Sequence, residues 1–80
     1  MNKQEIMERM NKVFREVFDN DHIAVKEETT ASDVEGWDSL THITLIFALE
    51  EQFGVKLAMK EVLELKNVGQ MADCVLRYLE

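Results

Sequence analysis

Apolar residues recur every three or four positions over residues 3–18, which predicts an amphipathic helix. Its other face carries oppositely charged side chains four residues apart, such as Glu5 and Arg9, as suits a solvated helix surface. The pattern stops at the polar run Asp19-Asn20-Asp21. The positions expected to face a core are Ile6, Met10, Val13, Phe14, Val17 and Phe18.

Residues 19–36 form a long connection without sustained periodicity. Loops of this length in a compact domain are usually functional or partly structured. We expect its apolar residues Ile23, Val25 and Val34 to hold it on the core. Trp37, the single tryptophan, follows, and we expect it to anchor the loop in the same way, with a partner contact as the alternative.

A second helix is predicted from Ser39 to about Phe53, with Asp38 or Ser39 as its cap and Gly54 as the residue that ends it. Its apolar residues fall on two faces. One face is an ordinary core stripe, made of Leu45, Ile46, Leu49 and Phe53.

The other apolar face of this helix consists of Leu40, Ile43 and Phe47, flanked by Glu50 and Glu51. A helix that is apolar on two sides is either central in its bundle or presents one stripe to a partner. We expect Leu40 to turn toward the core and Phe47 to turn toward a partner.

A short helical turn is predicted around Met59–Leu65, and a last helix opens near Asn67, with Gln70 three residues on as in a capping box. The chain is therefore predicted to be all-α. We expect residues 1–80 to form one small four-helix bundle, with three long helices, one short helix and a long loop between the first two. The buried stripe of the last helix is expected to be Val68, Met71, Ala72, Val75, Leu76 and Leu79.

The charge of the chain points to protein partners. Its 80 residues carry a formal net charge of −7, and residues 27–55 contain seven acidic side chains and no lysine or arginine. Such a field repels nucleic acid and anionic lipid and attracts basic protein surfaces. No apolar run approaches the roughly 20 residues of a membrane span, and a single cysteine, Cys74, fits a reducing compartment. We expect a cytoplasmic monomer that binds proteins.

The candidate chemistry centres on Ser39, at the predicted start of the second helix. The free N–H groups and dipole of a helix N-terminus favour a phosphate there, so this serine could be a cap, a nucleophile or an attachment point for a phosphodiester. Asp38 and His42 are close in sequence, but the pattern implies no oxyanion donors and no enclosed pocket, so we expect no catalysis. The loop fails the calcium-loop pattern at Ile23 and Ala24, and no zinc ligand set exists.

The run Gly36-Trp37-Asp38-Ser39-Leu40, followed by Ala48-Leu49-Glu50-Glu51-Gln52-Phe53-Gly54, resembles the acyl carrier proteins. The similarity extends over nearly the whole chain in length, acidity and helix pattern. It implies that Ser39, flanked by Asp38 and Leu40, carries a 4′-phosphopantetheine arm transferred from coenzyme A by a phosphopantetheinyl transferase. The arm would hold acyl groups as thioesters, and the protein would be a carrier and not an enzyme.

Partner enzymes are expected to dock through basic surfaces onto Ile43, Phe47, Glu50 and Glu51. This chain departs from general fatty-acid carriers after the serine, where Thr41, His42 and Thr44 replace the usual acids, and it places Lys56, Lys60 and Lys66 around the short helix. These departures suggest a specialised pathway. An aminoacyl or peptidyl carrier, and an unmodified helical adaptor, are the alternatives.

Overall fold

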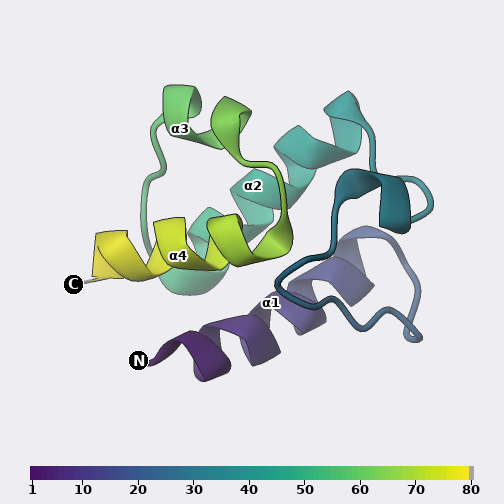
Figure 1. Cartoon of the computed structure of the whole chain (residues 1–80), viewed down its shortest axis with the longest axis horizontal. Helices are drawn as coiled ribbons and strands as arrows, with labels where there is room; N and C mark the ends of the chain where they lie inside the picture. Colours follow the sequence, from purple (N-terminus) through teal and green to yellow (C-terminus); the bar gives the residue numbers. More distant parts are fainter. Residues whose placement is uncertain (80) are drawn as a thin grey trace.

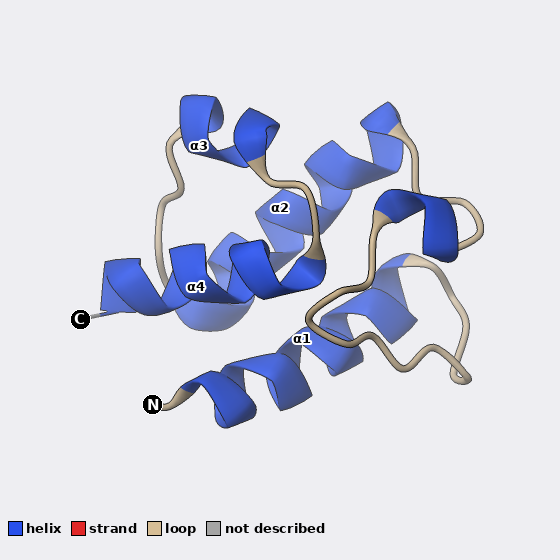
Figure 2. Cartoon of the chain, viewed as in Figure 1, coloured by secondary structure: helices blue, strands red, loops and turns tan. Residues whose placement is uncertain are grey.

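The computed structural model describes residues 1–79, which form four α-helices, one 3₁₀ turn and no strand (Figures 1 and 2). The predicted bundle of three long helices and one short helix is confirmed. Within the described residues no helix is long and apolar enough to cross a membrane. The elements are α1 (Lys3–Val17), η1 (Ala31–Asp33), α2 (Ser39–Phe53), α3 (Met59–Glu64) and α4 (Val68–Leu79).

Local sequence sets the helix ends. The side chain of Asn2 caps α1 by accepting a hydrogen bond from the Glu5 N–H at 2.9 Å. Gly54 ends α2 in the left-handed conformation, with a φ of +66°, as a glycine does most easily. Asn67 Oδ1 accepts from the Gln70 N–H at 2.8 Å at the start of α4, as its sequence predicted.

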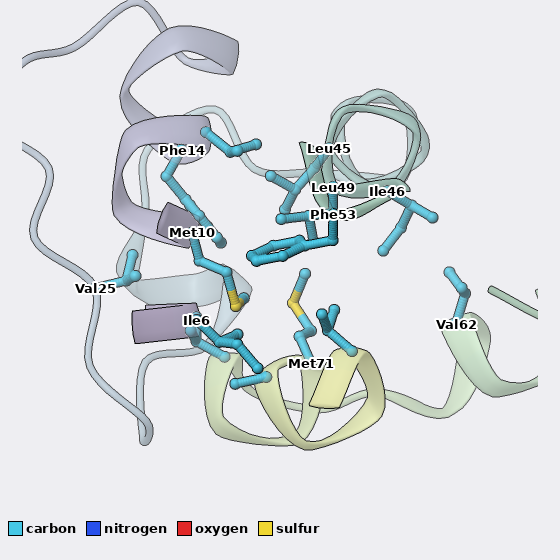
Figure 3. Close-up of a cluster of buried hydrophobic side chains, with 14 of the residues drawn as sticks. Ile6, Met10, Phe14, Val25, Leu45, Ile46, Leu49, Phe53, Val62 and Met71 are labelled. Carbon is cyan, nitrogen blue, oxygen red and sulfur yellow. The ribbon is translucent and has the colours of Figure 1, made fainter. Parts of the chain in front are cut away.

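The core lies among α1, α2 and α4. Figure 3 shows Met10 and Phe14 of α1 facing Leu45 and Leu49 of α2, with Met71 of α4 completing the cluster. The predicted core stripe of α2 is confirmed. The prediction for Leu79 is wrong: it is 38% exposed, because the cluster of α4 side chains ends at Val75 and the partly buried Leu76.

Helix α3 is attached more loosely than the long helices and lies apart from α1 (Figure 1). Its single buried side chain is Val62. Polar contacts with α4 supplement it: Glu61 pairs with Arg77 at 3.3 Å and accepts from the Cys74 thiol at 3.3 Å. Burial, followed by the hydrogen bond to Glu61, raises the pKa of the Cys74 thiol, so it stays protonated as the donor.

The long loop between α1 and α2 is held on the bundle by backbone contacts. Asn11 of α1 pairs with the backbone of Val25, accepting from its N–H at 2.7 Å. At the start of α4 the Val68 and Gly69 N–H groups donate to the carbonyls of Thr29 and Glu27, at 2.9 and 2.8 Å. A Cβ on Gly69 would lie 2.9 Å from the Glu27 oxygen, so only glycine permits this approach.

Candidate functional site

Ser39 is the first residue of α2, and its side chain is exposed. Asp38, rather than Ser39, caps the helix: its Oδ1 accepts from the N–H groups of Leu40 and Thr41, both at 3.0 Å. The Thr41 hydroxyl in turn accepts from the Asp38 N–H at 2.8 Å, which completes a capping box. These contacts fix the backbone on both sides of Ser39 and leave its hydroxyl facing solvent.

The cap predicts a measurable pH dependence. The hydrogen bonds, first of all that from the Thr41 N–H, hold the pKa of Asp38 below its ordinary value of 3.8. A carboxyl whose pKa is lower in the folded state stabilises the fold fully above its unfolded pKa and loses that contribution as pH falls through its folded pKa. We therefore expect Asp38→Ala to lower the free energy of unfolding near neutral pH, by a difference that shrinks below pH 3.8.

Urea unfolding of the natural chain and the variant at several pH values measures this difference. Asp38→Asn is the matched control, since asparagine also caps helices but does not titrate, and it should lose less stability than Asp38→Ala near neutral pH. A loss for Asp38→Ala that stays the same between neutral and strongly acidic pH would contradict a role for the ionised carboxylate.

Trp37 anchors the loop that leads to Ser39. It is 9% exposed, and its ring meets Phe14 edge-on, with centroids 5.2 Å apart. The prediction of a core anchor is confirmed. Its indole N–H donates to His42 Nδ1 at 3.0 Å, while His42 Nε2 lies 3.4 Å from the Val62 carbonyl. Both ring nitrogens of His42 therefore face groups other than Ser39, and the geometry offers no Ser–His catalytic pair.

The exposed stripe of α2 differs from its prediction at one end. Phe47 is 61% exposed and Ile43 is also exposed, but Leu40, which we expected to turn toward the core, is 76% exposed. Leu40, Ile43 and Phe47 follow one another at helical spacing on this surface. Leu40 therefore extends the exposed stripe.

Beside Ser39 lies an open cavity of about 480 Å³ between α2, α3 and the loop before α4. Sequence reasoning missed its outer wall, where Met59 and Leu63 of α3 are exposed. Their spacing of four residues, which places both on one side of the predicted helical turn, was the available signal. The cavity is lined by Ala31, Trp37, Asp38, Ser39, His42, Ile43, Met59, Val62, Leu63, Leu65, Lys66, Asn67 and Met71.

The flanking acids differ in their contacts. Glu50 is half-buried, and its Oε2 accepts from the Leu57 N–H at 2.8 Å, which ties the chain after α2 back onto the helix. Glu51 is exposed. The sequence could not reveal this tie, because it joins residues seven apart across the turn at Gly54.

Comparison with known proteins shows the family of the chain. Residues 8–75 match the family model described as phosphopantetheine attachment site. The acyl carrier protein of Thermosynechococcus vestitus is 33% identical over 94% of this chain and 93% of its own length. That of Acidothermus cellulolyticus is 32% identical over 94% of this chain and 89% of its own length. The chain belongs to the acyl carrier protein family.

A solved structure agrees with this assignment. The solution NMR structure of holo acyl carrier protein from Geobacter metallireducens has a TM-score of 0.86 and 43% sequence identity, and the match covers 92% of this chain and 85% of that one. The carrier described here is thus a phosphopantetheine-bearing acyl carrier protein with no catalytic activity of its own. Carriers of this family interact with biosynthetic enzymes and with a phosphopantetheinyl transferase.

Proposed function

We propose that Ser39 Oγ is the attachment point of the 4′-phosphopantetheine group, with Asp38 and Leu40 as its immediate neighbours. The observation that carries the proposal is the position of this hydroxyl: exposed, on the first residue of α2 and beside the cavity. The partial positive charge of a helix N-terminus favours a phosphodiester at that position. The residues present therefore fit the group.

The capping contacts suggest how Ser39 presents the group. Asp38 already accepts from the Leu40 and Thr41 N–H groups. These two donors are therefore occupied and do not clamp a phosphate. The helix dipole then favours the negative charge of the phosphodiester, while the phosphopantetheine arm stays free to move between partner enzymes and the cavity.

The attached group supplies a terminal thiol that holds an acyl chain as a thioester. We propose that the cavity beside Ser39 shelters this chain, since its walls include Ile43, Met59, Val62, Leu63 and Met71. Burial of apolar chain there is favourable by about 0.8 kcal/mol per CH₂.

We propose that partner enzymes dock on the surface formed by Ile43, Phe47, Glu50 and Glu51. The exposed apolar stripe of α2 supports this, because contiguous apolar side chains on a small protein commonly mark an interaction site. Basic groups on a partner would meet the acids at its end. We place the carrier in fatty-acid, polyketide or related biosynthesis. Thr41, His42 and Thr44, together with the lysines around α3, favour a specialised pathway.

Loading and release of an acyl group test this function. A broad-specificity phosphopantetheinyl transferase supplied with octanoyl-coenzyme A should add one octanoyl-phosphopantetheine to the intact protein. Treatment with hydroxylamine should then remove the octanoyl part and leave the phosphopantetheine, as expected of a thioester. An octanoyl mass that resists hydroxylamine would contradict thioester carriage.

Phe47→Ala tests the docking surface. An exposed aromatic residue at the centre of an interface typically contributes more than about 1 kcal/mol to binding. We therefore expect the transfer of phosphopantetheine by the transferase, measured at low carrier concentration, to slow roughly fivefold or more. Stability should change by no more than about 0.5 kcal/mol, because the ring is exposed. Gln52→Ala, an exposed position on the same helix, is the matched control. A large loss of stability with unchanged transfer would place Phe47 outside the docking surface.

A further inference from the structure

The cavity beside Ser39 contains a hydrogen-bonded chain that crosses from the loop to α3. The Trp37 indole N–H donates to His42 Nδ1 at 3.0 Å. Because the indole nitrogen can only donate, Nδ1 accepts and the proton of the neutral ring lies on Nε2. His42 Nε2–H therefore donates, and the acceptor it faces is the Val62 carbonyl oxygen at 3.4 Å.

This last contact is long, at the limit of a hydrogen bond. The Val62 carbonyl also accepts from the Leu65 N–H, at the end of α3. If His42 Nε2–H donated to another acceptor instead, the Val62 oxygen would still accept from the Leu65 N–H. The His42 Nε2–H is thus a donor that a better acceptor can capture at little cost to α3.

The other polar groups of the cavity wall have partners or lie in solvent. The Asp38 carboxylate is engaged in the cap of α2, and Asn67 Oδ1 accepts from the Gln70 N–H at 2.8 Å. The Lys66 side chain is exposed at the rim. His42, by contrast, is half-buried among apolar walls.

These contacts bear on which acyl chains would fit the cavity. A saturated chain that separates His42 from Val62 leaves the Nε2–H of this half-buried ring without its acceptor, and a donor that is shielded from water and has no partner is unfavourable. A hydroxyl can accept from Nε2–H and donate to the Val62 carbonyl, and a keto oxygen can accept from Nε2–H. Building on the proposed attachment at Ser39, we propose that His42 makes this carrier selective for acyl chains that bear a hydroxyl or keto oxygen.

The test compares two acyl chains of equal length on the intact carrier. The transferase loads octanoyl- and 3-hydroxyoctanoyl-phosphopantetheine from the corresponding coenzyme A thioesters, and intact mass confirms both products. The rate of cleavage by hydroxylamine is then measured relative to the same acyl group on free pantetheine. We expect the hydroxyacyl thioester to be protected roughly tenfold more than the octanoyl thioester, the factor that corresponds to about 1.4 kcal/mol.

Imidazole ¹⁵N spectra give a readout independent of cleavage. The His42 Nε2–H signal should shift with the hydroxyacyl chain, while Nδ1 remains an acceptor of the Trp37 N–H. His42→Leu should remove the preference by improving protection of the octanoyl chain, and His42→Gln, which keeps an N–H donor, should retain part of it. Thr44→Leu, at an exposed position of α2 that does not line the cavity, should leave both rates unchanged.

The outcomes separate this inference from the proposed attachment. If both chains load on the natural carrier and are equally protected, with the His42 signal unmoved, the selectivity is overturned while attachment stands. If neither chain loads on the folded protein, attachment fails and the selectivity fails with it. The comparison of the two acyl groups on the natural protein tests the selectivity even if His42→Leu does not fold.

Discussion

Ser39→Ala abolishes loading of the carrier and leaves it folded: this is the largest effect we expect from a single substitution. The alanine has no oxygen to form the phosphodiester, so transfer from fluorescently labelled coenzyme A should fall to background. Stability should change by no more than about 0.5 kcal/mol, because Ser39 is exposed and alanine is a good helix residue. Gel fluorescence and thermal unfolding measure the two quantities.

The control for this substitution is Ser32→Ala. Ser32 is the only other serine of the chain, and it is likewise exposed, in η1. This variant should load as the natural chain does. Residual labelling of Ser39→Ala that disappears only when Ser32 is also replaced would move the attachment point to η1.

Phe14→Ala should cause the largest loss of stability. Phe14 is 0% exposed and packs against Trp37, so it joins α1 to the segment that precedes Ser39. Truncation of a buried phenylalanine typically removes about 3–5 kcal/mol, and a domain of this length has roughly 4–12 kcal/mol in total at 0.05–0.15 kcal/mol per residue. We therefore expect a partly unfolded protein and a clearly lower urea midpoint.

The matched control is Phe47→Ala, which removes the same atoms from an exposed position. The two variants should separate stability from function: Phe14→Ala loses stability, and Phe47→Ala slows transfer in a folded protein. Similar losses of stability in both would contradict the assignment of one ring to the core and the other to the docking surface.

The sequence predicted the long helices well, because each carries several independent signals. For α2 the cap at Asp38 or Ser39, the core stripe from Leu45 to Phe53 and the stop at Gly54 agree with one another, and the structure assigns the cap to Asp38. The exposure of Leu40 could not be read from the same periodicity, since its angle on the helix does not say which neighbour fills the adjacent space.

The chemistry at Ser39 was visible in local sequence, but its surroundings were not. The cavity depends on where α3 lies, and α3 has only six residues and one buried side chain. The chain of hydrogen bonds from Trp37 through His42 to Val62 joins positions up to 25 residues apart through a ring nitrogen and a backbone carbonyl. Neither residue spacing nor composition carries information about such contacts.

The central claim, attachment at Ser39, is tested most directly by the mass of the natural protein after incubation with coenzyme A and a broad-specificity phosphopantetheinyl transferase, followed by fragmentation to locate the addition. The account predicts the gain of one phosphopantetheine, on Ser39 alone. A folded, helical protein that gains no mass, or gains it on another residue, would contradict it.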